Sequence, residues 1–134
     1  MRIAILDLTH HPLPLLSGIR RAGERIKDWI SPCFFDTKFE IFDIAAGIDQ
    51  APSMRNFDAL IVSGSERSVY DDIPWHDDVS HVLHESREMG KPIFGICFGH
   101  QIIASTFGGE VRRSCGDASI GIKKFVQTNG HTFN

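Results

Sequence analysis

The chain has 134 residues, of which 42% are hydrophobic and 23% charged, and its formal net charge is -3 with histidine neutral. These values are close to the average for globular proteins, so they exclude a disordered chain and predict one domain with its own core. The small net charge offers no basic surface, and no nucleic-acid partner is predicted. No apolar run approaches the roughly 18 residues of a membrane span, so no membrane association is predicted either.

The cysteines indicate a reducing compartment. Cys33, Cys97 and Cys115 are an odd number at wide spacing, which implies no disulfide framework. The apolar run at the N-terminus is too short for a signal peptide, so a cytoplasmic location is expected. No linker, repeat or nucleotide-binding motif interrupts residues 1–134, which predicts a single domain without a cofactor.

The first half of the chain alternates between strand and helix patterns. Residues 2–8 form an aliphatic, β-branched run that predicts a buried strand. Residues 16–30 place apolar side chains at three- and four-residue steps, which predicts an amphipathic helix that ends before Pro32. Polar and apolar residues alternate over 38–44, which predicts a second strand.

The second half continues this alternation. Its predicted elements are a strand over 57–65, a helix over 74–90, a strand over 92–97, a helix over 99–107, and shorter strands over 110–113 and 119–127. Pro74 suits the first turn of its helix, and Gly90 and Gly108-Gly109 suit helix ends. Apolar strands alternating with helices predict an α/β fold whose mostly parallel sheet is covered on both faces.

A cysteine lies at a sharp predicted corner. The spacing Gly95-x-Cys97-x-Gly99, between a strand and a helix, matches a nucleophile elbow with cysteine in place of serine. The glycines leave room where the backbone doubles back, and the partial positive charge of the helix N-terminus favours a thiolate. The N–H of Phe98 can then help to bind a developing oxyanion. The alternative is a buried cysteine between packing glycines, which the strand, the helix and a neighbouring glycine loop make less favourable.

That glycine loop carries a second motif. SGSERSVYDD, residues 63–72, follows the preceding strand and is expected at the same sheet edge as the cysteine. Together with GICFGHQ, residues 95–101, it resembles the class I (triad-type) glutamine amidotransferases, especially stand-alone members similar to GMP synthase. The resemblance extends from the first strand to about residue 127. It implies a flavodoxin-like three-layer sandwich with a mostly parallel central sheet, of which the C-terminal strands are missing.

The resemblance also implies roles for individual residues. Cys97 would attack the side-chain amide of glutamine, forming a γ-glutamyl thioester and releasing ammonia. The backbone N–H groups of Gly64 and Phe98 would form the oxyanion hole. Gln101 would help to hold the α-amino-acid end of the substrate, and His100 beside it would have a supporting role. Glutamine is thus the implied small-molecule partner, and a synthetase domain or subunit would accept the ammonia.

The base that activates the cysteine is not found. The family uses a histidine oriented by a glutamate in an H-x-E motif, and none follows Cys97. Apart from His100 in the elbow motif, His131 is the only later histidine, and its place in the chain order favours a loop residue. The chain is therefore expected to be incomplete at its C-terminus, with little or no glutaminase activity. An exposed sheet edge would then favour self-association into a homo-oligomer.

Other functions stay open. A degenerate domain could act as a binding or regulatory module, and a stand-alone member could hydrolyse a γ-glutamyl amide. Cysteine-elbow peptidase-like and chaperone-like proteins have a histidine where this chain has Phe98, which disfavours that class. His81 and His84 have a spacing that can bind metal, but a solvated helix face is favoured and no metal site is predicted.

Overall fold

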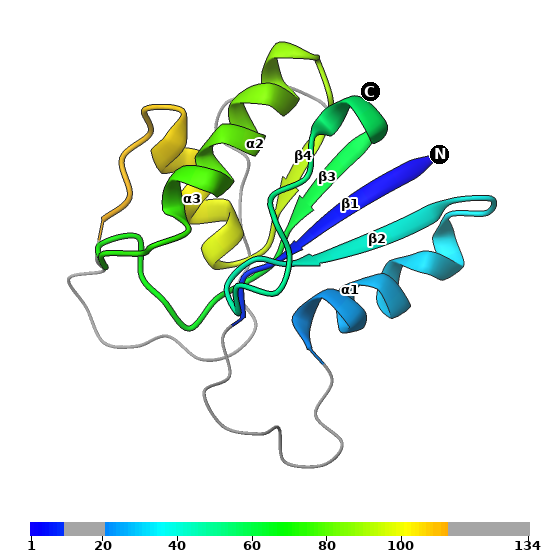
Figure 1. The fold of residues 1–134 in the computed structure, drawn as a ribbon, viewed down its shortest axis with the longest axis horizontal. Helices are drawn as coiled ribbons and strands as arrows, with labels where there is room; N and C mark the ends of the chain where they lie inside the picture. Colours follow the sequence, from blue (N-terminus) through cyan, green and yellow to red (C-terminus); the bar gives the residue numbers. More distant parts are fainter. Residues whose placement is uncertain (10–20, 113–134) are drawn as a thin grey trace, which may run out of the picture.

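The computed structural model describes residues 1–9 and 21–112. Its elements are β1 (Arg2–Asp7), α1 (Ala22–Ile30), η1 (Ser31–Cys33), β2 (Lys38–Asp43), η2 (Met54–Asn56), β3 (Ala59–Val62), α2 (His76–Glu88), β4 (Ile93–Gly95) and α3 (Phe98–Thr106). The strands form a 4-stranded sheet in the order β2-β1-β3-β4, with every pairing parallel (Figure 1). The predicted parallel α/β sheet is confirmed.

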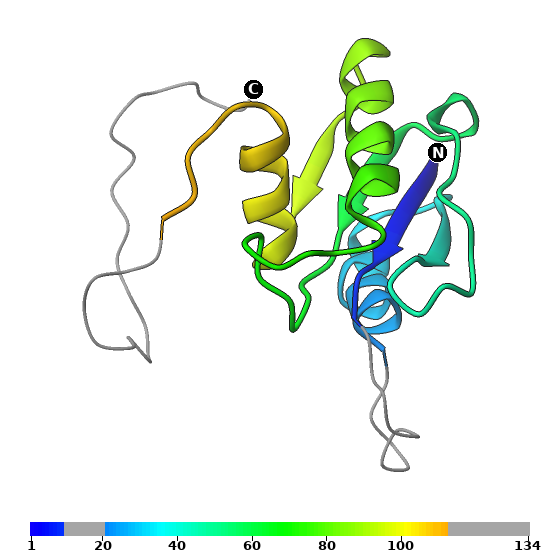
Figure 2. The same cartoon turned by 60° about the vertical axis from the view of Figure 1, so that its left-hand side comes forward.

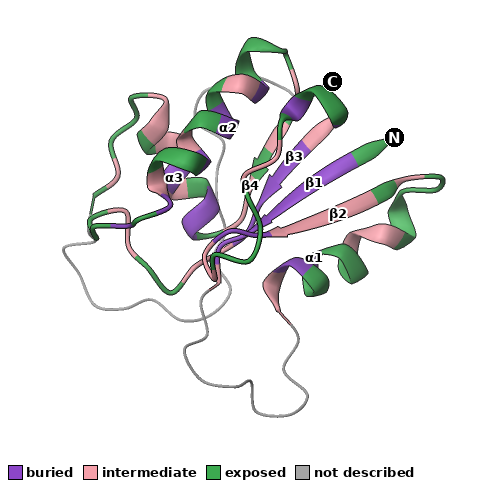
Figure 3. Ribbon diagram, in the orientation of Figure 1, coloured by how far each residue is buried: buried purple, intermediate pink, exposed green. Residues whose placement is uncertain are grey.

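Helices cover both faces of this sheet. Figure 2 shows α1 on one side and α2 with α3 on the other. Alternate residues of β1 supply the two cores: Ile3 and Ile5 pack with Ile26 of α1, while Ala4 and Leu6 join the cluster under α2 and α3. Figure 3 shows the buried residues concentrated along β1 and β3, as expected for the central strands of a covered parallel sheet.

The predicted ends of α2 and α3 are confirmed. Gly90 follows α2 with φ +64°, and Gly108 follows α3 with φ +82°. After α3, the N–H of Gly108 donates to the carbonyl of Ser105, and that of Gly109 to Ala104. The equivalent pair of bonds closes α2. Both ends are Schellman motifs, in which a left-handed residue satisfies the last carbonyls of the helix.

The start of α1 differs from its prediction. Residues 16–20 lie outside the described part, and Arg21 is extended, with φ -61° and ψ 158°. The buried carboxylate of Asp7, at the end of β1, accepts the N–H of Gly23 at 2.8 Å. This bond satisfies one of the free N–H groups of the first turn, so the helix begins at Ala22 beside the end of β1.

Several strands are shorter than predicted. β3 ends at Val62 and β4 at Gly95, because the chain leaves the sheet to form the loops that follow. Residues 110–112, within the short strand predicted over 110–113, are not in a strand. Here the carbonyl of Val111 accepts the hydroxyl of Tyr70 at 2.6 Å. The strand predicted over 119–127 lies outside the described residues.

Beside the edge strand β4, the described elements leave part of the α1 face of the sheet uncovered. Among the described residues, β4 pairs only with β3. Phe94 on β4 is 59% exposed, and Trp29 on α1 is 70% exposed. In the described part of the chain, no helix is long and apolar enough to cross a membrane.

Segment 44–58, which connects β2 to β3, is attached to α2 by one carboxylate. Glu85 accepts the N–H of the buried Met54 at 2.7 Å and the hydroxyl of Ser53 at 2.9 Å. The Met54 N–H is the main cause that lowers the pKa of Glu85 from its usual value of 4.5. The ionised carboxylate therefore stabilises the packing of this connection against α2.

We expect Glu85→Gln to lower the free energy of unfolding at pH 7 by about 1 kcal/mol, because an amide replaces a charged acceptor. Since folding lowers the pKa of Glu85, its contribution is present above the unfolded pKa and is lost as pH falls through the folded pKa. Urea unfolding at pH 7 and at about pH 3 measures both effects. Glu88→Gln, at an exposed position of the same helix, is the control. An equal loss in the two variants would contradict this role.

Candidate active site

Cys97 occupies a strained turn between β4 and α3. Its φ is 53° and its ψ is -112°, which match the first central position of a type II′ turn, normally taken by glycine. The N–H of Gly99 donates to the carbonyl of Ile96 at 2.9 Å and closes the turn. The N–H of Gln101 donates to the carbonyl of Cys97 at 3.2 Å, so Cys97 is the N-cap of α3. Its side chain is exposed at the sheet edge.

The two flanking glycines are required by close backbone contacts. A Cβ on Gly95 would lie 2.5 Å from the carbonyl carbon of Gly99. A Cβ on Gly99 would lie 2.3 Å from the carbonyl oxygen of Val62, at the end of β3. Both distances are shorter than any real contact of a Cβ atom, so the steric reason predicted for this spacing is confirmed.

Phe98 anchors the start of α3 in the core. Its side chain is 1% exposed, and its ring meets the ring of Trp75 edge-on, with 5.9 Å between centroids. The backbone N–H of Phe98 is in the first turn of α3 and has no acceptor within the helix. A buried side chain therefore fixes the position of a backbone donor next to the thiol.

The loop after β3 comes beside the cysteine. A Cβ on Gly64 would lie 3.6 Å from the Cβ of Cys97, an ordinary van der Waals distance. Further along the loop, the N–H of Ser68 donates to the carboxylate of Asp71 at 2.8 Å. The N–H of Asp71 donates back to the carbonyl of Ser68 at 2.9 Å. Asp71, which belongs to the motif of this loop, thus holds the loop in a turn.

The other predicted site residues lie on the first turns of α3. His100 is exposed and Gln101 is half-buried. Within residues 1–9 and 21–112, no side chain forms a hydrogen bond with the thiol of Cys97. His131, which was considered as a base, lies outside the described residues. The described part of the site therefore combines the thiol and backbone donors without a general base at hydrogen-bonding distance.

The histidine pair of α2 that was considered for a metal site lies at exposed positions. His81 and His84 are both exposed, and the ring of His84 meets the ring of Phe107 edge-on at 5.5 Å. In the described ranges, no three histidine, cysteine or acidic side chains are grouped so that they could hold a metal ion.

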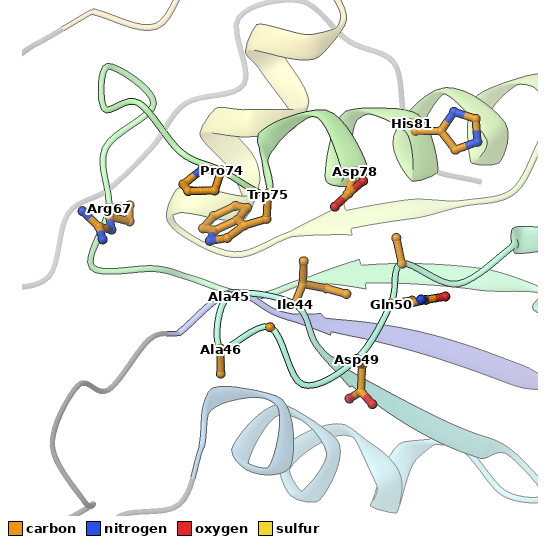
Figure 4. A pocket seen from close by; sticks show the side chains of 12 residues that line it. Ile44, Ala45, Ala46, Asp49, Gln50, Arg67, Pro74, Trp75, Asp78 and His81 are labelled. Carbon is orange, nitrogen blue, oxygen red and sulfur yellow. The ribbon is translucent and has the colours of Figure 1, made fainter.

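Trp75 also borders a hollow that the sequence did not indicate. This cavity of about 800 Å³ lies between segment 44–51 and the start of α2 (Figure 4). Trp75 and Pro74 line it from one side and Ile44 and Ala45 from the other, with Arg67 at one end. Trp75, which lines this cavity, also contacts Phe98, the residue after Cys97.

The fold and this turn define an α/β protein with a cysteine nucleophile elbow, and sequence comparison gives the family. The profile described as "Glutamine amidotransferase class-I" matches residues 24–133. The chain therefore belongs to the class I glutamine amidotransferase family. It is a class I glutamine amidotransferase domain with the flavodoxin-like fold expected from its motifs.

Similar proteins include gamma-glutamyl peptidases and GMP synthases. Gamma-glutamyl peptidase 3 of Arabidopsis thaliana is 32% identical over 96 residues, which cover 69% of this chain and 39% of that protein. The glutamine-hydrolyzing GMP synthase of Thermotoga maritima is 33% identical over 78 residues, which cover 58% of this chain and 15% of that protein. The chain thus spans less than half the length of each of these relatives.

A solved structure supports the fold. The glutamine amido transferase from Methylobacillus flagellatus superposes with a TM-score of 0.64 at 23% identity. The match covers 84% of this chain and 41% of that structure.

We expect Gly99→Ala to lower the free energy of unfolding by about 3 kcal/mol or more, because the added methyl group would overlap the carbonyl of Val62. Alanine favours a helix over glycine by about 1 kcal/mol, so a net loss isolates the clash. Gly64→Ala is the matched control, and its methyl group has room, so a change within about 1 kcal/mol is expected. Urea unfolding compares the two variants. Equal losses would argue against the close approach of α3 to β3.

Proposed function

We propose that Cys97 is the nucleophile of a site that cleaves the side-chain amide of glutamine. The observation that carries this proposal is the position of the thiol: it lies on a strained turn at the sheet edge, between the loop at Gly64 and the N–H of Phe98. A nucleophile beside preorganised backbone donors is the arrangement needed for acyl transfer.

The reaction would proceed through a thioester. The thiolate of Cys97 attacks the amide carbon, and the electron pair of the carbonyl moves to its oxygen. The resulting oxyanion accepts hydrogen bonds from the N–H of Phe98 and from the loop at Gly64. When the carbonyl re-forms, the C–N bond breaks, and the nitrogen leaves as ammonia after taking a proton. Water then attacks the thioester and releases glutamate and the thiol.

The remaining predicted contacts concern the substrate and its partners. Gln101 would hold the α-amino-acid end of glutamine, and His100 would support it from the same turn of α3. The ammonia would be used by a synthetase domain or subunit. Self-association would use the edge of β4 that has no partner strand among the described residues, beside the exposed Phe94.

A second candidate is hydrolysis of γ-glutamyl amides other than glutamine. The relatives named gamma-glutamyl peptidases support it, because glutamine is itself a γ-glutamyl amide and the acyl half of both substrates is the same. A domain that binds without catalysis remains the non-enzymatic alternative, supported by the absence of a base near Cys97 among the described residues.

We predict that a chloroketone analogue of glutamine alkylates Cys97 at least about tenfold faster than Cys33, relative to the rates with iodoacetamide. Both thiols are exposed, so Cys33 is an internal reference for a thiol without a glutamine site. Peptide mass spectrometry at several times gives both rates. Excess glutamine should slow the alkylation of Cys97 alone. Equal relative rates, unaffected by glutamine, would refute the proposed site.

Ammonia release from glutamine tests turnover separately. This chain is expected to release little ammonia, because no base lies at hydrogen-bonding distance from Cys97 within the described residues. Cys97→Ala gives the background rate. Turnover at ordinary rates that disappears in this variant would overturn the expectation of low activity while supporting the nucleophile.

A further inference from the structure

A buried hydroxyl connects the loop beside Cys97 to the centre of the sheet. Ser63 is the first residue after β3 and is 0% exposed. Its Oγ accepts the N–H of Leu8 at 2.8 Å and donates to the carbonyl of Gly64 at 2.8 Å. Its backbone N–H donates to the carbonyl of Leu6 at 3.0 Å. Ser63 is therefore held by β1 through both its backbone and its side chain.

The Ser63 hydroxyl orients the peptide between Gly64 and Ser65. It lies toward β1, where Leu8 follows the strand, so it directs the carbonyl of Gly64 to that side. The structure contains no cis peptide among the described residues, and in a trans peptide the N–H points opposite to the carbonyl. Since β1 and β4 lie on opposite sides of β3, this orientation places the N–H of Ser65 on the side of β4, the strand that leads to Cys97.

The peptide between Ser63 and Gly64 has the reverse orientation. The carbonyl oxygen of Ser63 lies toward the start of α3, where a Cβ on Gly99 would come within 2.8 Å of it. By the same geometry, the N–H of Gly64 faces away from α3. The peptide that presents a donor toward the thiol is thus the one whose carbonyl the Ser63 hydroxyl holds.

We propose that Ser63 is a positioning residue for the oxyanion hole: its hydroxyl holds peptide 64–65 so that the N–H of Ser65 faces the carbonyl under attack by Cys97. This inference rests on the proposed function of Cys97. Ser63 itself touches no reacting atom. In this arrangement the donor of the loop is the N–H that follows Gly64, and it acts together with the N–H of Phe98.

The sequence signal for Ser63 is weak. It is the polar residue at which an apolar strand gives way to a glycine, which is equally typical of an ordinary turn. The bond between the Ser63 hydroxyl and the N–H of Leu8 is visible only in the structure, because the two residues are 55 positions apart in the chain.

The test compares two electrophiles on the same thiol. With the chloroketone analogue of glutamine, the sulfur of Cys97 forms a C–S bond and chloride leaves with its electron pair, while the ketone oxygen occupies the oxyanion hole. Iodoacetamide forms the same type of bond without a ketone in that position. The ratio of the two rates therefore reports the oxyanion donors and cancels changes in thiol exposure.

We expect Ser63→Ala to lower this ratio about tenfold or more, because the released peptide no longer presents a fixed donor. Ser63→Gly should give the same decrease by a different truncation. Ser63→Thr, which retains the hydroxyl, should stay within about threefold of the wild type. All rates are measured below the melting temperature of each variant.

Ser86→Ala is the matched control. Ser86 is also 0% exposed, and its hydroxyl donates to the carbonyl of Val82 at 2.7 Å within α2. A decrease in Ser86→Ala equal to that in Ser63→Ala would assign the effect to general stability and overturn the proposal. An unchanged ratio in folded Ser63→Ala would overturn it too. If the wild-type chain shows no preference for Cys97 over Cys33, both this inference and the proposed function fail; a preference that survives Ser63→Ala overturns this inference alone.

Discussion

The approach of α3 to the end of β3 is the contact on which the candidate site depends. The carbonyl of Val62 lies where a side chain on Gly99 would have to be, so the helix can pack here only with glycine at that position. The same carbonyl accepts the N–H of Ile96 at 3.0 Å. The chain must then reverse direction within one residue, and that residue is Cys97 with φ 53°. The position of the thiol follows from how closely two backbones pack.

A strained residue persists only when its surroundings stabilise it. A backbone conformation of this kind costs about 1–3 kcal/mol in a residue other than glycine. Phe98 and Ile102, which follow in α3, are 1% and 0% exposed and pack into the core beneath α2. Burial of side chains of this size contributes about 1.5–3 kcal/mol each, enough to offset the strain. The hydrophobic face of α3 therefore holds the exposed thiol in place.

The sequence predicted the elements whose causes are local. The glycines around Cys97 are required by close backbone contacts, so their spacing predicted the elbow. The glycines after α2 and α3 adopt positive φ, so they predicted both helix ends. The end of β3 could not be read in this way, because a serine and a glycine after an apolar run do not say at which residue strand pairing stops. In the structure it is the Ser63 hydroxyl that bonds to Leu8 and to Gly64. Residues 110–112 have a strand-like pattern, but the carbonyl of Val111 accepts a hydrogen bond from the hydroxyl of Tyr70 and not from a neighbouring strand. In both places the conformation depends on a contact between residues far apart in the chain, which no local sequence pattern predicts.

The names of the two kinds of relative are compatible with one site, because glutamine and a γ-glutamyl peptide share an acyl group. The turn of Cys97 and the donors beside it would act on the carbonyl, and the proposed contact of Gln101 is with the α-amino-acid end. Both of these belong to the γ-glutamyl half of the substrate. Discrimination between ammonia and a larger amine depends on the groups that face the departing nitrogen. Under the proposed function, the elbow and its donors would act on the γ-glutamyl acyl group, and the same elbow would suit either leaving group.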